Sequence, residues 1–247
     1  MRAVFPTMGT VASIDLPGRL ANDPAVQLIR DLLDDAESRF SLYRSDSELS
    51  RVASGALGLL DASEDLREAY GLAMDWHLRT AGAFTPNRPD GVVDLNGVVK
   101  ARSIVEASAL LRSNGIHDWS LNVGGDLACS GNPESGEWTA GIVDPGDRAA
   151  LIATVTLRPG RRAIATSGSA ERGDHIWLLD HAGVADFIQV TVVAEDILTA
   201  DVLATAIVAG GGATLDLATD GWPIDVLAVR SDGTLLATPG LRVPARD

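Results

Sequence analysis

Asp201 and Thr205 lie four residues apart in an apolar run of this 247-residue chain. On a helix the two side chains would share one face, and the neighbours Leu203, Ile207 and Val208 predict that this helix is largely buried. A buried carboxylate needs a cation, a hydrogen-bond donor or a proton. Carboxylate and hydroxyl oxygens suit Mg²⁺. An aspartate bonded to backbone, with the threonine bonded to its own helix, fits the same spacing, so both interpretations stay open.

A second candidate site lies in the segment from Asp94 to Lys100, which reads as the start of a helix. Asp94 or Asn96 can cap that helix. Free amides at the helix N-terminus, together with Lys100, would form an anion site. A simple cap and a solvated lysine are the alternative.

Two further clusters could contact a ligand. The paired glycines Gly124 and Gly125 interrupt a predicted strand, which indicates either a structural bulge or the close approach of a ligand. Thr166-Ser167-Gly168 ends another strand and is followed by His175. A histidine in this setting is most often structural, and a general base is the alternative. The sequence has no G-x-S-x-G elbow, so a hydrolase serine is not supported.

The elements that must position these residues are predicted from periodicity. Asp23-Pro24 starts an amphipathic helix that continues to Phe40, and further helices are expected over about 65–80 and 98–111. The second half reads mostly as strands. Alternating or β-branched runs place them at 119–127, 137–143, 151–157, 162–166 and 187–194, and Asp232-Gly233 predicts a hairpin between 226–230 and 234–237.

This order of elements lacks regular βαβ alternation. It therefore favours an α+β fold with mixed or antiparallel sheets and packed helices. No linker, repeat or low-complexity tract separates parts of the chain. We expect a single domain over residues 1–247, in one or two lobes.

Composition limits the function classes. The formal net charge of −14 argues against nucleic acid and against an anionic membrane surface. No apolar run suggests a membrane-spanning helix or a signal peptide, so we expect no membrane insertion and a cytoplasmic location. The single cysteine, Cys129, allows no internal disulfide and reads as a small buried hydrophobe.

Short motifs follow one another in a fixed order along most of the chain. They are Met8-Gly9-Thr10, Phe40-Ser41-Leu42-Tyr43-Arg44, Ser47-Glu48-Leu49, Gly82-Ala83-Phe84, Asp94-Leu95-x-Gly97-x-x-Lys100, Asn122-x-Gly124-Gly125-Asp126, Thr166-Ser167-Gly168, His175 and Ala200-Asp201-x-x-x-Thr205. Each motif is weak alone. As an ordered set from Met8 to about Gly211, they resemble the ApbE family, the FAD:protein FMN transferases.

The resemblance implies a function and a set of site residues. It implies an α+β fold related to the T-fold, and Mg²⁺-dependent transfer of FMN from FAD to a threonine of an acceptor flavoprotein, releasing AMP. It implies Asp201 and Thr205 as side-chain metal ligands, a backbone carbonyl near Val99 as a third ligand, and catalytic roles for His175 and Asp201. The positions that match FAD-holding residues of the family are Met8, Tyr43, Ala83, Phe84, Thr85, Asp94, Gly97 and Lys100.

Two other functions remain open for the same residues. Water could replace the acceptor threonine, which would make the protein an FAD pyrophosphatase giving FMN and AMP. A flavin-binding module without turnover is the third interpretation. The sequence barely separates the first two, because water and threonine can use the same site.

Overall fold

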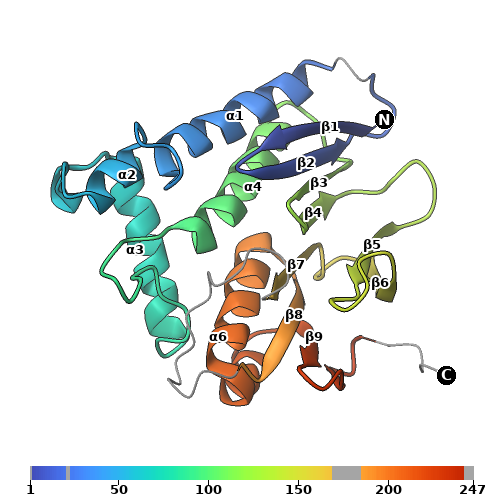
Figure 1. Cartoon of the computed structure of the whole chain (residues 1–247). Coiled ribbons are helices and arrows are strands. Elements are labelled where there is room, and N and C mark those ends of the chain that lie inside the picture. The colour runs from blue at the N-terminus through green and yellow to red at the C-terminus, as the bar shows by residue number, and fades with distance from the viewer. Residues whose placement is uncertain (1, 21–22, 169–184, 242–247) are drawn as a thin grey trace.

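One eight-stranded antiparallel sheet organises the computed structural model, which describes residues 2–20, 23–168 and 185–241 (Figure 1). The strand order is β1-β2-β3-β4-β7-β8-β9-β10. The bounds are β1 Arg2–Thr7, β2 Thr10–Asp15, β3 Trp119–Val123, β4 Asp126–Ser130, β7 Ala163–Gly168, β8 Phe187–Ala194, β9 Asp225–Arg230 and β10 Leu235–Ala237. The fold is therefore α+β with an antiparallel sheet, as the sequence predicts.

The two faces of the sheet carry different layers. Helix α6 (Ile197–Gly221) packs on β7 and β8, α4 (Asn96–Ser113) packs on α6, and α1 (Pro24–Phe40) packs on α4 (Figure 1). A separate hairpin of β5 (Trp138–Val143) and β6 (Leu151–Leu157) shares an apolar cluster with the opposite face. Because strand side chains alternate, Ala163 and Ala165 join the main core while Ile164 joins the cluster under the hairpin.

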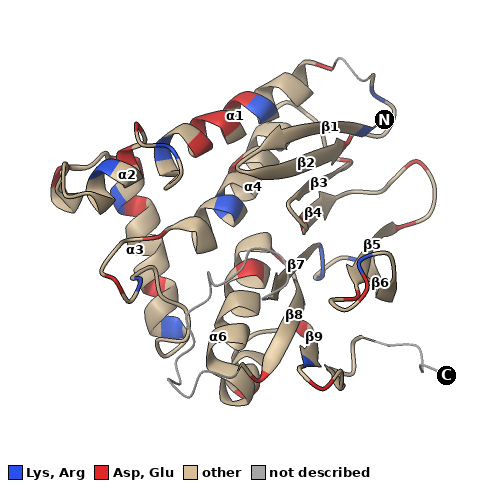
Figure 2. Cartoon of the chain, in the orientation of Figure 1, with Lys and Arg blue, Asp and Glu red and all other residues tan. Residues whose placement is uncertain are grey.

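Helix α1 shows how the local sequence sets an element. Pro24 occupies the first turn, and the Asp23 carboxylate accepts a hydrogen bond from the Ala25 amide at 2.9 Å, which lowers the pKa of Asp23. Ile29 and Leu33 are fully buried. The acidic face of the helix is exposed, and Figure 2 marks acidic positions in red along α1 at the top of the molecule. The helices α2 (Glu48–Ala53) and α3 (Glu64–Arg79) follow it, with a short 3₁₀ turn at Leu59–Asp61 between them.

Helix α6 is the central core helix. Asp196 caps it by accepting from the Thr199 amide at 2.9 Å, and Leu203 and Ile207 are fully buried. By length and hydropathy alone, α6 could cross a membrane, but 61% of its most apolar window is buried inside the fold. That degree of burial is typical of a core helix. The helix is kinked at Gly211, where φ is 63°.

The observed secondary structure differs from the prediction in one strand assignment and one unpredicted helix. Residues 119–127 do not form one strand with a bulge: β3 and β4 form a hairpin in which Val123 pairs with Asp126. Gly124 and Gly125 are its two loop residues, with φ of 60° and 98°, the backbone that glycine adopts without strain. Helix α2 was not predicted, because six residues are too short to show periodicity.

Candidate functional site

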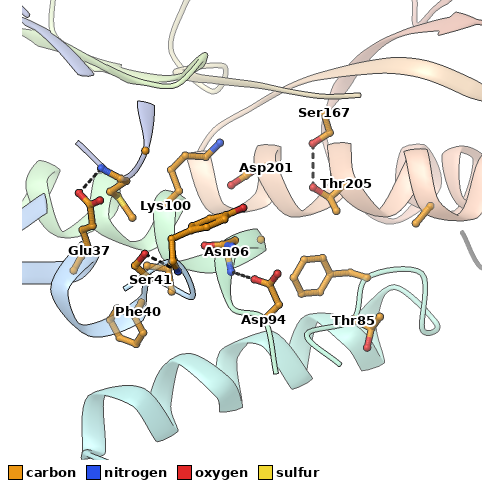
Figure 3. Close-up of a pocket in the computed structure, with 18 of the residues that line it drawn as sticks. Glu37, Phe40, Ser41, Thr85, Asp94, Asn96, Lys100, Ser167, Asp201 and Thr205 are labelled. Atoms are coloured by element: carbon orange, nitrogen blue, oxygen red, sulfur yellow. Dashed lines mark hydrogen bonds between the residues drawn. The ribbon is translucent and has the colours of Figure 1, made fainter. Parts of the chain in front are cut away.

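A cavity of about 290 Å³ lies where the helices meet the end of β7. Its walls come from the β1–β2 turn, the end of α1, the α3–α4 loop, the start of α4, β7 and α6 (Figure 3). The cavity is lined by every described residue to which the family resemblance assigns a metal-binding or FAD-binding role: Met8, Tyr43, Ala83, Phe84, Thr85, Asp94, Gly97, Val99, Lys100, Asp201 and Thr205. The paired glycines Gly124 and Gly125, the other candidate ligand contact, do not line it. His175 lies outside the described residues.

Oxygen donors gather along one wall of the cavity. Asp201 is only 5% exposed, and Thr205 follows it one turn later on α6. The Thr205 hydroxyl lies 3.0 Å from the Ser167 hydroxyl of β7 (Figure 3). In the described ranges no three acidic, histidine or cysteine side chains cluster as a metal site. One carboxylate with hydroxyls nevertheless fits Mg²⁺, which keeps waters and substrate oxygens in its remaining positions.

The third expected metal donor, the carbonyl of Val99, is already engaged. Val99 is 2% exposed in the first turns of α4, and its carbonyl oxygen accepts a hydrogen bond from the Ser103 hydroxyl at 2.8 Å. Within α4 the same oxygen also faces the backbone amide four residues later, so both lone pairs of this carbonyl are already used. The side chains of Asp201 and Thr205 therefore form the better-defined part of the donor set.

The Lys100 side chain, on helix α4, is held by a carboxylate from the main sheet. Its ammonium forms an ion pair with Asp126 of β4, whose side chain is 0% exposed, while that of Lys100 is 14% exposed. The solvated lysine of the alternative interpretation is therefore wrong. The paired glycines matter because their turn brings Asp126 beneath the start of α4.

The N-terminus of α4 is not an open anion site. The Asp94 carboxylate accepts from the Asn96 amide at 2.9 Å, and the Val98 and Val99 amides both bond to the Leu95 carbonyl. Leu95 takes the cap position, and no side chain caps it. The local turn thus uses the Asn96, Val98 and Val99 amides, which leaves fewer donors for an anion than the sequence suggests.

The aromatic wall is formed by Phe84, which is 3% exposed. Its amide donates to the Thr80 hydroxyl at 3.0 Å, and its carbonyl lies 2.8 Å from Nδ1 of His77. Gly97 lets the ring approach α4 closely, since a Cβ there would lie 2.7 Å from the Phe84 ring. Close packing against Phe84 therefore explains the glycine in the Asp94–Lys100 motif.

Tyr43 and Arg44 lie in the loop after α1 and contribute to the cavity. Tyr43 is 81% exposed, so its ring is available to an incoming ligand. Ser47 fixes the loop by donating from its hydroxyl to the Ser41 carbonyl at 2.6 Å. The hydrogen bond from Arg44 to Asp46 raises the pKa of Arg44 and lowers that of Asp46, so both stay charged.

Sequence reasoning missed one acidic residue in the cavity wall. Glu37 reads as part of the polar face of α1, yet its carboxylate accepts a hydrogen bond from the Met8 amide at 2.7 Å (Figure 3). Nothing in the local sequence connects two residues 29 positions apart. Ser167 was noted only as one hydroxyl in a cluster, and its pairing with Thr205 needs the tertiary fold.

The antiparallel sheet, the buried core helix and a cavity lined by oxygen donors and aromatic side chains define an α+β protein with a site for a small molecule. The family model described as the ApbE family matches residues 8–90 and 86–227. The chain belongs to the ApbE family.

Similar proteins agree with that membership. The FAD:protein FMN transferase of Rhodobacter capsulatus is 27% identical over an alignment of 221 residues, which covers 81% of this chain and 37% of that protein. The chain thus spans well under half the length of this relative. The FAD:protein FMN transferase of Vibrio cholerae is 24% identical over 269 residues, covering 83% of this chain and 80% of that protein. The solved ApbE protein of Thermotoga maritima has the same fold, with a TM-score of 0.77, 17% identity and 97% coverage of both chains.

Proposed function

We propose that this protein transfers FMN from FAD to a threonine of an acceptor flavoprotein and releases AMP. The observation that carries the proposal is that one cavity collects all the described residues implied by the family resemblance. They come from segments spread between Met8 and Thr205. The two curated relatives carry the name of this activity.

Each part of the cavity has a role in the proposed reaction. The buried Phe84 and the exposed Tyr43 offer aromatic surface to the ring systems of FAD. Lys100, fixed by Asp126, offers a positive charge for the pyrophosphate. Asp201 and Thr205 would hold Mg²⁺, and Ser167 would orient the Thr205 hydroxyl. When bound, Mg²⁺ supplies charge neutralisation at the pyrophosphate.

In the proposed transfer, the acceptor threonine oxygen forms a bond to the FMN phosphorus while the bond to the AMP oxygen breaks. The threonine proton passes to a base. His175 is our candidate for that base, on the family resemblance alone.

We also propose that the protein works in the cytoplasm without membrane insertion or nucleic acid, in keeping with its net charge of −14.

Chromatography of the nucleotide products tests this proposal. The protein is incubated with FAD and Mg²⁺, with and without a candidate acceptor flavoprotein. Transfer predicts AMP release that depends on the acceptor, with no matching free FMN. Equal amounts of free FMN and AMP without acceptor would instead establish the pyrophosphatase. Tight FAD binding with no product would establish a binding module.

A further inference from the structure

The turn that presents Met8 to the cavity has an unusual backbone. Thr7 pairs with Thr10, so Met8 and Gly9 are the two loop residues of the β1–β2 hairpin. Their φ angles are 49° and 67°. A loop with positive φ at both positions favours asparagine followed by glycine. A methionine at the first position is strained, because its Cβ approaches the following carbonyl.

Met8 shares this strain with few other residues. In residues 2–20, 23–168 and 185–241, the non-glycine residues with positive φ are Met8 and Ala81. Strained backbone persists only where surrounding structure holds it, and it is concentrated at ligand sites. Met8 satisfies both conditions, since it lines the cavity and its amide is bonded to Glu37.

The bond from Met8 to Glu37 supplies the restraint. In a two-residue hairpin loop, the amide of the first loop residue lies outside the strand ladder. Here that amide donates to Oε2 of Glu37 at 2.7 Å, so α1 holds the turn from the side. A carboxylate acceptor makes the bond stronger than one between neutral groups. Glu37 itself lines the cavity, together with its helix neighbours Ala36 and Phe40.

We propose that Glu37 is a positioning residue for ligand binding, which acts by fixing the strained turn so that Met8 forms one wall of the cavity. The inference rests on the proposed function in that FAD is taken as the ligand. It adds Glu37 to the site as a residue that affects ligand binding through the backbone of Met8. The strain at Met8 is retained because the site needs this side chain at this place.

Equilibrium binding of FAD to the whole chain, followed by quenching of flavin fluorescence, tests the proposal alongside the thermal midpoint of each variant. Glu37→Ala is expected to weaken FAD binding about tenfold, whereas Glu37→Gln keeps an accepting oxygen and stays within about threefold of the wild type. Asparagine suits this turn, so we expect Met8→Asn to raise the thermal midpoint by about 2–4 °C. The same variant should bind FAD more weakly, because it lacks the Met8 side chain. If the turn had only a structural role, Met8→Asn would not raise the thermal midpoint and weaken FAD binding at the same time.

A matched control is Glu48→Ala. Glu48 also accepts from a backbone amide, that of Ser63 at 2.6 Å, but it does not line the cavity. This variant is expected to lower the midpoint and leave FAD affinity unchanged. A double variant, Glu37→Ala with Met8→Ala, completes the set. The single variant Met8→Ala is measured beside it. If Glu37 acts through Met8, the loss of FAD affinity in the double variant is smaller than the sum of the losses in Glu37→Ala and Met8→Ala.

Three results would overturn the proposal. The first is unchanged FAD affinity in Glu37→Ala and Met8→Asn. The second is Glu37→Gln binding as weakly as Glu37→Ala, which would mean that the charge acts directly on the ligand. The third is additivity in the double variant. If Glu37→Ala fails to fold, Glu37→Gln and Met8→Asn still decide the matter. Failure of the wild type to bind FAD would count against the proposed function instead.

Discussion

Lys100 of α4, which lines the cavity, forms an ion pair with Asp126 of β4, whose carboxylate is completely buried. The pair connects a helix to a strand on the main sheet, and it places the lysine ammonium where an anionic ligand can reach it. A buried charge whose partner is removed loses its compensation in a medium of low dielectric constant. We therefore expect this ion pair to affect both the stability of the protein and its binding of an anionic ligand.

We predict that Lys100→Ala lowers the free energy of unfolding by about 3–5 kcal/mol, because it leaves the buried Asp126 charge without its ion-pair partner. Asp126→Ala should cost less, because Lys100 is partly exposed and lines the cavity. Urea denaturation measures the effect. The double variant Lys100→Ala with Asp126→Ala should cost less than the sum of the two single losses.

The exposed pair between Arg88 and Asp90 provides the control for this experiment, since their side chains are 36% and 52% exposed. Arg88→Ala should cost less than about 1 kcal/mol. Strictly additive losses at Lys100 and Asp126 would contradict the account.

Asp201→Asn should abolish most activity while the protein stays folded, because an amide is a much poorer metal ligand than a carboxylate. We expect the rate to fall by about a hundredfold or more. Calorimetry with Mg²⁺ alone should show lost binding. Asp196→Asn is the matched control, since Asp196 only caps the same helix. Wild-type Mg²⁺ affinity in Asp201→Asn would disprove the proposed ligand.

Ser167→Ala removes the hydroxyl that lies 3.0 Å from that of Thr205. Residues that orient metal ligands typically contribute about 10–100-fold to metal affinity, so we expect Mg²⁺ binding to weaken by that factor. Thr191→Val is the control: it breaks a similar hydroxyl pair, with Thr166 at 2.8 Å, without itself lining the cavity. Equal Mg²⁺ affinities in the two variants would rule out a specific role for Ser167.

Gly97→Ala should push the Phe84 ring out of place, because the added Cβ would lie 2.7 Å from it. Overpacking of this kind costs about 1–3 kcal/mol. FAD binding should weaken at the same time, since the ring lines the cavity. Gly71→Ala in α3 has open space around the added Cβ and should stabilise the protein by about 0.5–1 kcal/mol. Unchanged FAD affinity in Gly97→Ala would count against this packing role.

Much of the fold could be predicted from the sequence, because the relevant signals are local. The alternation in residues 151–157 and the β-branched run at 187–194 gave the bounds of β6 and β8 as observed. The Asp23 cap and the apolar periodicity likewise predicted the observed bounds of α1, Pro24 and Phe40. Paired glycines do not distinguish a bulge from a hairpin turn until the strand partners are known, so the Gly124-Gly125 turn was misassigned.

The candidate site was predicted in its residues but not in its contacts. The ordered family motifs pointed to Asp201, Thr205 and Lys100, and all three line one cavity. The partner of Lys100 is Asp126, and the partner of Met8 is Glu37. These pairs join separate elements, so no periodicity or local spacing reveals them.

The central claim is tested most directly by intact-protein and peptide mass spectrometry of an acceptor flavoprotein after incubation with this protein, FAD and Mg²⁺. We predict the mass of one FMN added to a threonine, and no addition with Asp201→Asn or with an acceptor whose target threonine is changed to valine. An unmodified acceptor, with FAD converted to free FMN and AMP in the same reaction, would contradict the account.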